Sequence, residues 1–79
     1  MNYLKVYNQL IQKRRDNPII KTDDCYCERH HIIPKSEGGS NKKSNLVNLT
    51  AREHYIAHLL LAKIYDDYKM WNALTYFKS

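Results

Sequence analysis

A chain of 79 residues has room for one small domain, whose thin core usually needs a metal, a disulfide or a partner to stabilise it. The two cysteines are too few and too close together for a disulfide framework, so we expect reduced thiols, a cytoplasmic location and a metal as the stabilising element. The formal net charge of +5 favours a polyanionic partner, and the lack of a long apolar run or a signal-peptide pattern argues against a membrane or secreted protein.

The N-terminal segment, residues 3–15, is predicted to form an amphipathic helix. Its apolar stripe, whose members recur at three- and four-residue steps, consists of Leu4, Tyr7, Leu10 and Ile11. Pro18 and the polar residues before it end the helix, because proline disfavours the helical conformation in the preceding residue. The basic cluster at residues 13–15 either complements the helix dipole or contacts a phosphate, and both interpretations stay open.

Two strands separated by a long loop are predicted next. Residues 25–33 have β-branched and aromatic character and predict a strand that Pro34 ends. Residues 34–45 contain both glycines of the chain and several other turn formers, which predict a loop. Residues 46–49 alternate in polarity, so we expect a short second strand that pairs back on the first.

The second half of the chain is predicted to be helical. Thr50 and Glu53 form a capping box, after which a helix runs over residues 51–65. One apolar row of this helix consists of Ile56, Leu60 and Ile64, and a neighbouring row consists of His54, His58, Leu61 and Tyr65. A short final helix over residues 68–77 is expected to turn three side chains inward, and these are Trp71, Leu74 and Phe77.

All four histidines of the chain lie in two places. His30 and His31 lie in the first predicted strand, and His54 and His58 lie one turn apart on one face of the long helix. A hairpin that leads directly into a capped helix brings its first strand against the first turns of that helix, so we expect the two groups to converge. Three neutral imidazoles on one divalent metal form an open site, with positions left for water or substrate.

Four pieces of sequence together carry a family resemblance, namely His30-His31, the glycine-bearing loop, Asn45-Leu-Val-Asn-Leu-Thr, and His54-x3-His58. They resemble the HNH (ββα-metal) endonucleases, and the surrounding sequence is most similar to the short phage-borne and intron-associated homing-type members. The resemblance covers residues 25–65 strongly and the flanking segments more loosely. It implies an α+β fold in a single domain, residues 1–79, with a small ββα-metal hairpin-helix core flanked by N-terminal and C-terminal helices.

The resemblance also implies a role for each matching histidine and for Asn45. His30, His54 and His58 would bind the metal, and His31 would be the general base that takes a proton from the attacking water. The amide of Asn45 would bridge backbone groups of the loop and fix the loop that aims His31. A neutral imidazole suits the base, because an unperturbed histidine titrates near pH ~6.5.

The function that follows is a metal-dependent DNA endonuclease or nickase, encoded by a phage in a bacterial host. It would hydrolyse phosphodiester bonds with one divalent metal, which would neutralise the charge that develops on the phosphate. Imidazole ligands suit Zn or Ni, whereas Mg or Mn prefers oxygen donors, so the identity of the metal stays open. The expected partner is double-stranded DNA, contacted mainly through its phosphates, with no membrane, and a homodimer or an additional DNA-recognition partner stays open.

Two other functions compete with the nuclease. The first is a non-catalytic zinc-stabilised DNA-binding module, in which Cys25 or Cys27 would close the site formed by three of the histidines. The second is an interaction domain without a metal, whose histidines are polar core residues. Many HNH proteins carry two Cys-x-x-Cys pairs around the hairpin, and because this chain has neither pair we expect no structural zinc of that kind.

Several other residues have two interpretations. Glu28 is either an outer partner of a metal-bound histidine or, as we favour, a solvent-facing strand residue. The seven tyrosines are expected to be mostly half-buried, with their hydroxyls in water. Asn41 and Asn48 are rivals to Asn45, but the first lies in the turn and the second in the strand. Basic residues near the site either hold phosphates or are ordinary surface charges, and they are Arg29, Lys35, Lys42, Lys43 and Arg52.

Overall fold

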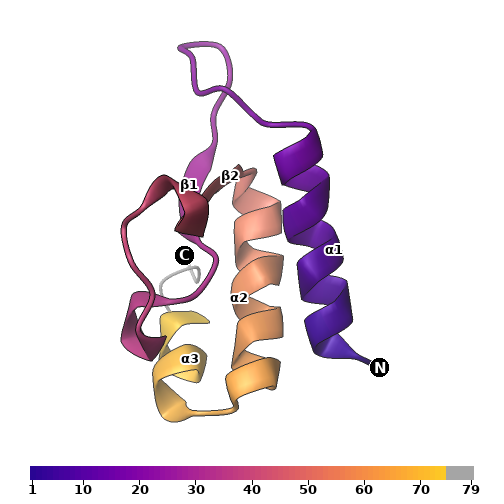
Figure 1. The fold of residues 1–79 in the computed structure, drawn as a ribbon, viewed down its shortest axis with the longest axis vertical. Coiled ribbons are helices and arrows are strands. Elements are labelled where there is room, and N and C mark those ends of the chain that lie inside the picture. The colour runs from indigo at the N-terminus through magenta and orange to yellow at the C-terminus, as the bar shows by residue number, and fades with distance from the viewer. Residues whose placement is uncertain (75–79) are drawn as a thin grey trace.

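The computed structural model describes residues 1–74, and Figure 1 shows how their elements are arranged. The helices and strands in chain order are α1 (Tyr3–Asp16), β1 (Glu28–His31), β2 (Leu46–Leu49), α2 (Ala51–Tyr65) and α3 (Tyr68–Ala73). Two short 3-10 turns lie between the strands, and these are η1 (Lys35–Glu37) and η2 (Lys43–Asn45). A two-stranded antiparallel sheet that leads into a helix confirms the α+β fold and its hairpin-helix core.

Helix α1 lies beside α2 and packs against it (Figure 1). Tyr7 and Ile11 are buried as the stripe predicted, but Leu4 is 54% exposed. Tyr3, rather than Leu4, packs against the core at this end of the helix. The prediction was therefore wrong in its first turn, where the buried face is rotated by one residue.

The hairpin register decides which histidine faces the helices. His30 pairs with Val47 and His31 pairs with Leu46. Successive residues of a strand point to opposite faces, so buried His30 and Val47 face the helices while the more exposed His31 lies on the other face.

Strand β1 is shorter than the predicted strand over residues 25–33. Cys25 makes only an isolated bridge with Thr22. At the other end, the backbone N–H and C=O of Ile33 bond to the side chain of Asn45 instead of to a neighbouring strand. The chain therefore leaves the sheet after His31, before Pro34 is reached.

Helix α2 has the predicted bounds and the predicted capping box. The Glu53 backbone N–H donates to Oγ1 of Thr50 at 3.1 Å, and Oε1 of Glu53 accepts from the Thr50 backbone N–H at 3.0 Å. The buried face consists of Ala57, Leu60, Leu61 and Ala62. Ile56 is 38% exposed, so the core-facing side of α2 is rotated away from the predicted Ile56 row and lies closer to the histidine row.

Helix α3 is capped at its N-terminus by Asp67, whose side chain accepts a hydrogen bond from the Met70 backbone N–H at 2.9 Å. Met70 is buried, and Leu74 packs against the core. Trp71, predicted to face inward, is instead 41% exposed, because its Nε1–H donates to Oδ1 of Asp66 near the surface. Phe77, the third predicted inner residue, lies outside the described residues.

The hydrophobic core lies between α1, α2 and the inner face of the hairpin. Its buried members are Tyr7, Ile11, Val47, Leu49, Ala57, Leu60, Leu61, Ala62 and Met70. Within residues 1–74, no helix has both the length and the apolarity needed to cross a membrane. The core holds β1 against the first turns of α2, the arrangement on which the site depends.

Candidate active site

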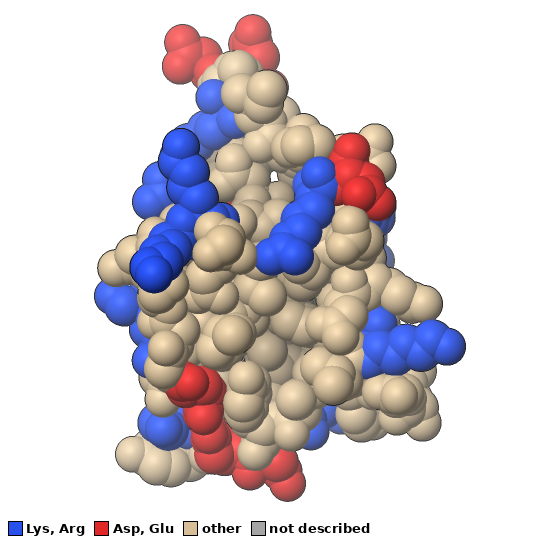
Figure 2. Space-filling view, viewed as in Figure 1, with Lys and Arg blue, Asp and Glu red and all other residues tan. Residues whose placement is uncertain are grey.

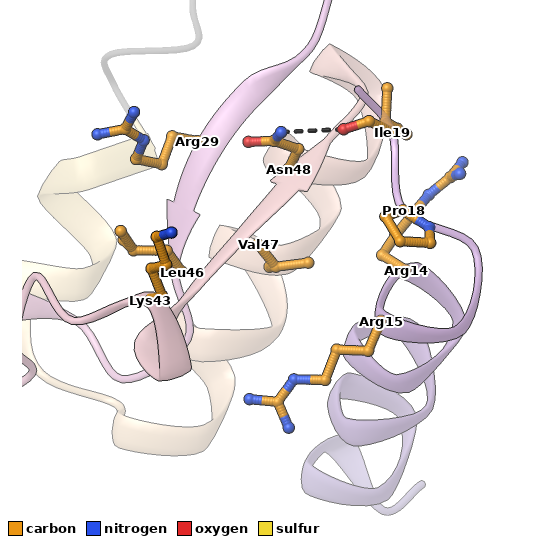
Figure 3. Close-up of a pocket in the computed structure, with 9 residues that line it drawn as sticks. All are labelled: Arg14, Arg15, Pro18, Ile19, Arg29, Lys43, Leu46, Val47 and Asn48. Carbon is orange, nitrogen blue, oxygen red and sulfur yellow. Dashed lines mark hydrogen bonds between the residues drawn. The ribbon is translucent and has the colours of Figure 1, made fainter. Parts of the chain in front are cut away.

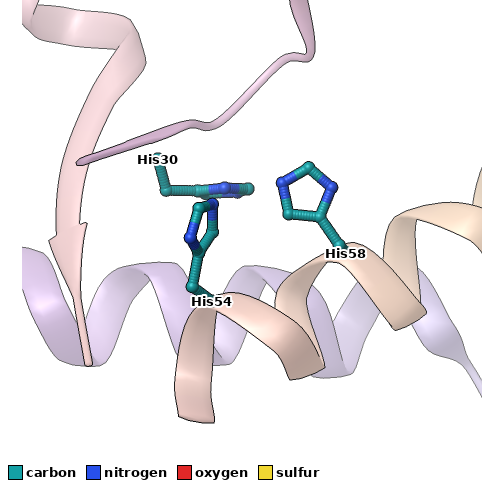
Figure 4. Close-up of side chains that lie close together, drawn as sticks. All are labelled: His30, His54 and His58. Carbon is teal, nitrogen blue, oxygen red and sulfur yellow. The ribbon is translucent and has the colours of Figure 1, made fainter. Parts of the chain in front are cut away.

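Three histidines from two elements converge at the inner face of the hairpin (Figure 4). His30 comes from β1, and His54 and His58 come from successive turns of α2. Each offers a ligand nitrogen, and these nitrogens lie within 4.8 Å of one another. The ring centroids are 5.1 Å apart for His30 and His54, 5.2 Å for His30 and His58, and 4.9 Å for His54 and His58. This group is called the histidine cluster below.

The surroundings keep two of these imidazoles neutral. Burial lowers the pKa of His30 to about 3, with smaller contributions in the same direction from the neighbouring imidazoles of His58, His54 and His31. Burial, followed by His54, lowers the pKa of His58 to about 4. A neutral imidazole keeps a lone pair for a cation, so near neutral pH these groups are in the form that a metal ligand requires.

Tyr7 fixes which nitrogen of His30 carries the proton. The Tyr7 hydroxyl lies 2.7 Å from the Ile32 carbonyl oxygen, which can only accept, so the hydroxyl donates there. The Tyr7 hydroxyl oxygen also lies 2.7 Å from Nε2 of His30, so it must accept a hydrogen bond from Nε2–H. Nδ1 is then the nitrogen with a lone pair, and it is buried without a hydrogen-bond partner among the described residues. An orphaned basic nitrogen in a cluster of imidazoles fits a bound cation.

The hydrogen bond between Tyr7 and His30 was not predicted from the sequence, because most tyrosine hydroxyls were expected to lie in water. Tyr7 is buried because α1 packs against α2 and β2, and its hydroxyl replaces water as the partner of His30. Burial, and to a smaller extent the charge of Tyr65, raises the pKa of Tyr7 well above its usual value. The Tyr7 hydroxyl therefore stays protonated and can donate a hydrogen bond. The only signal in the sequence was the position of Tyr7 on the apolar stripe.

Glu28 plays the matching role for His54. Nδ1–H of His54 donates to Oε1 of Glu28 at 2.7 Å, which leaves Nε2 of His54 with the lone pair. The hydroxyl of Tyr26 donates to the other carboxylate oxygen. The hydrogen bond from Tyr26, and to a smaller extent the one from His54, lowers the pKa of Glu28. The solvent-facing interpretation of Glu28 was therefore wrong, since its carboxylate is bonded to His54, as the outer-partner interpretation requires.

His31 lies on the other side of the strand, yet it borders the same opening. It lines a hollow of about 430 Å³ together with His54 and His58, and cationic Arg29, Lys35 and Lys69 are also in its wall. Oδ1 of Asn41 accepts from Nε2 of His31 at 2.8 Å, which leaves Nδ1 of His31 able to take a proton. Asn41, which sequence reasoning set aside as a turn residue, thus orients the ring.

The side chain of Asn45 fixes the loop between the strands through hydrogen bonds to its backbone. Its Oδ1 accepts from the Ile33 backbone N–H at 2.8 Å, and its Nδ2 donates to the carbonyls of Ile33 at 3.0 Å and Ser40 at 2.8 Å. Gly39 is required beside it, because a Cβ there would lie 1.7 Å from the Ile33 oxygen. The loop that carries Asn41 to His31 is therefore fixed at both ends.

The cysteines lie apart from the histidine cluster. Cys25 and Cys27 are free thiols, and the cluster of potential metal ligands found in residues 1–74 contains only His30, His54 and His58. Three protein ligands, rather than four, correspond to an open site. The basic cluster at residues 13–15 also has a role that neither sequence interpretation gave, since Lys13 and Arg14 form ion pairs with Glu53 at 3.4 and 2.8 Å.

The model of the HNH endonuclease family matches residues 16–58, which include the hairpin and the first half of α2. The chain belongs to the HNH endonuclease family. The residues that this match spans hold Glu28, the four histidines and Asn45, so the family match and the geometry refer to the same part of the molecule.

Curated relatives of this HNH protein come from a phage and from an intron. Probable mobile endonuclease D of Enterobacteria phage T4 is 56% identical over 66 residues, covering 82% of this chain and 26% of the relative. Probable mobile endonuclease E of the same phage is 54% identical over 65 residues, covering 82% and 44%. An uncharacterized 38.5 kDa protein in psbA intron 1 of Chlamydomonas moewusii is 39% identical over 61 residues, covering 77% and 17%. The chain thus spans less than half the length of these relatives, and no solved structure matches it significantly.

Proposed function

We propose that this HNH domain hydrolyses phosphodiester bonds of double-stranded DNA with the help of one divalent cation. The observation that carries the proposal is the convergence of His30, His54 and His58 beside a hollow that His31 also lines. These residues fit a cation, because two of the imidazoles are held neutral and Nδ1 of His30 is buried without a partner among the described residues. A divalent cation held by the three histidines would supply Lewis-acid neutralisation of the charge that develops on the phosphate.

The proton transfer is the work of His31. Nδ1 of His31 accepts a proton from the attacking water while Nε2–H stays bonded to Asn41, so the ring keeps its orientation as it becomes charged. The new P–O bond forms as the bond to the 3′ oxygen breaks, and the departing 3′ oxygen takes a proton from solvent water, which leaves a 5′ phosphate and a 3′ hydroxyl. Asn45 contributes indirectly by fixing the loop that carries Asn41.

Incubation of supercoiled plasmid with the wild type and with His31→Ala tests this function. Each protein is assayed with Mg, Mn, Ni, Zn or a chelator, because imidazole ligands favour Ni and Zn whereas the phosphate favours the harder ions. We expect cleavage by the wild type with at least one metal and a loss of about 10²- to 10⁴-fold in His31→Ala. Gln9→Ala, on the exposed side of α1, is the control and should cleave as the wild type does.

Two outcomes would contradict the proposal. Equal cleavage by His31→Ala and the wild type would remove His31 as the base. Binding of DNA and metal by the wild type without cleavage under any of these conditions would instead favour the non-catalytic DNA-binding module.

A further inference from the structure

A second basic surface lies outside the histidine cluster, between the end of α1 and the outer face of β2 (Figure 3). It is a groove of about 520 Å³. Its cationic lining residues are Arg14, Arg15, Arg29 and Lys43. Figure 3 shows Arg15 and Arg29 on opposite sides of β2, so the cations border the groove on both sides. We call this surface the basic groove.

The charge of the basic groove is unbalanced. Among residues 1–74, no carboxylate lines it, and of its cations Arg14 alone has an acidic partner, Glu53, with Nε–O distances of 2.8 and 3.0 Å. Among the described residues, Arg15, Arg29 and Lys43 form no ion pair, and all three are exposed. Figure 2 shows one face of the molecule, on which Lys and Arg side chains are most numerous in the upper half and acidic groups lie at the upper tip, at the upper right and at the lower edge. Several like charges around one hollow favour an anionic ligand.

The walls of the basic groove are held in place by hydrogen bonds. Nη2 of Arg15 donates to the Ser44 carbonyl at 3.0 Å, which links the last turn of α1 to turn η2. Nδ2 of Asn48 donates to the Ile19 carbonyl at 2.9 Å, which links β2 to the segment after α1 (Figure 3). A ligand that enters this groove therefore meets cations whose supporting backbone is already ordered, which lowers the entropy cost of binding.

The basic groove adjoins the hollow beside His31. Arg29 lines both of them. Arg29 and His31 are two residues apart on β1, so they lie on the same face of the strand, roughly 6.6 Å apart along it. Lys35 and Lys69 stand in the wall of the hollow beyond His31. An extended anion that enters between Arg15 and Lys43 is thus led past Arg29 to the proposed base.

We infer that the basic groove binds the sugar-phosphate backbone of one DNA strand, next to the phosphodiester that lies at His31. Arg15, Arg29 and Lys43 contact successive phosphates, and the apolar side chains of Leu46 and Ile19 face the sugars. A chain of phosphates suits this surface better than a single anion, because Arg15 and Arg29 lie on opposite sides of β2 and Arg29 also lines the hollow beside His31. This inference rests on the proposed function, since it takes DNA as the substrate.

The salt dependence of DNA binding in the presence of a chelator tests the inference without any cleavage. A fluorescent duplex is titrated with the wild type, Arg15→Gln, Lys43→Ala and the double variant. Each lost phosphate contact lowers the slope of log Kd against log salt by about 0.9, so the weakening between about 50 and 200 mM salt should shrink about 3.5-fold per variant. Glutamine at position 15 removes the charge but keeps a side-chain N–H donor, and thermal melting checks that the fold survives the loss of the Arg15–Ser44 bond.

Two further variants serve as matched controls. Lys5→Ala removes one charge from the first turn of α1, roughly 15 Å along the helix from Arg15, and should leave the salt slope unchanged. Arg15→Lys keeps the charge and should keep the wild-type slope.

The possible outcomes separate this inference from the proposed function. Wild-type slopes in Arg15→Gln and Lys43→Ala would overturn the basic groove as a DNA site, even if His31→Ala abolishes cleavage. Reduced slopes would support it even if no cleavage is found. A poly-glutamate peptide that binds the wild type as tightly as the duplex, and is weakened by the same variants, would assign the groove to an acidic protein and overturn the inference.

Discussion

At the scale of single residues, hydrogen bonds from outside the histidine cluster decide which nitrogen of each ring carries the lone pair. The Tyr7 hydroxyl accepts a hydrogen bond from Nε2–H of His30, and the Glu28 carboxylate accepts one from Nδ1–H of His54. Neither partner touches the proposed substrate. They are positioning residues, and partners of this kind typically change metal affinity when they are removed.

Tyr7→Phe should weaken metal binding while the domain stays folded. Phenylalanine keeps the ring in the core but removes the oxygen that accepts from His30, so Nε2–H must find another partner or the tautomer must change. We expect about a 10- to 100-fold loss of Zn or Ni affinity by calorimetry. The ¹⁵N chemical shifts of His30 should report a mixture of tautomers. Unchanged affinity and shifts would contradict this role, and Tyr68→Phe, whose ring is exposed, is the control.

Glu28→Ala should also weaken metal binding, through His54. The variant removes the acceptor that orients the imidazole and makes it more basic, which typically costs 10- to 100-fold, or about 1.4 to 2.7 kcal/mol. Glu28→Gln keeps an acceptor oxygen and should lie between the wild type and Glu28→Ala in a metal titration. Asp24→Asn, in the exposed loop before β1, removes a charge without touching the cluster and should have no effect. Equal affinities for all four proteins would mean that Glu28 has no part in the site.

At the scale of elements, Glu53 joins α1 to the start of α2. It completes the capping box with Thr50 and pairs with Arg14 on α1. Burial alone would raise the pKa of Glu53, but the bonds from Arg14, the Thr50 backbone N–H and Lys13 together lower it to about 2. The helix that supplies Tyr7 is thus fixed to the helix that supplies His54 and His58.

Glu53→Gln should lower the melting temperature and remove part of the acid sensitivity. A carboxyl whose pKa is lower in the folded state stabilises the fold above its unfolded pKa of about 4.5, and this stability is lost as the pH falls towards about 2. Glutamine keeps the capping-box acceptor, so what is lost is the charge that faces Arg14 and Lys13, at a cost of about 0.2 to 1 kcal/mol at neutral pH. Melting curves at pH 7 and pH 3 should differ less for the variant than for the wild type. An identical pH dependence would show that Glu53 contributes nothing, and Asp23→Asn is the exposed control.

The elements also show what the sequence could predict. The strand at residues 46–49 and the helix over residues 51–65 have their predicted bounds, because alternation and the capping box are local signals. The first strand was predicted too long, because the side chain of Asn45, twelve residues away, takes the backbone groups of Ile33. The local pattern of polar and apolar residues carries no information about a contact made across a loop.

For the candidate site, the sequence predicted which histidines would meet but not what surrounds them. His54 and His58 share a helix face, and the hairpin connection brings His30 to that face, so this convergence follows from spacing. The bonds of Tyr7 to His30 and of Asn41 to His31 depend on how α1 and the long loop pack. Such tertiary contacts could not be predicted from periodicity.

At the scale of the whole molecule, the metal-free domain should lose stability as the pH falls below about 6.5. His30 and His58 have lower pKa values folded than unfolded, so the unfolded chain binds more protons in acid. The loss should begin near the unfolded pKa and continue towards pH 4. Melting temperatures between pH 8 and pH 4 measure it, and His31→Ala should keep the decline because the cluster is intact. A melting temperature independent of pH over this range would contradict the buried, neutral cluster.

A bound cation would link β1 to α2 and so stabilise the thin core of a 79-residue chain. Calorimetric titration of the metal-free protein with Zn or Ni, repeated on His58→Ala and His31→Ala, tests this centre most directly. We predict one site per chain in the wild type, loss of that site in His58→Ala, and an intact site in His31→Ala. A wild type that binds neither metal, or a His31→Ala variant that loses binding as fully as His58→Ala, would contradict a three-histidine centre with a separate base.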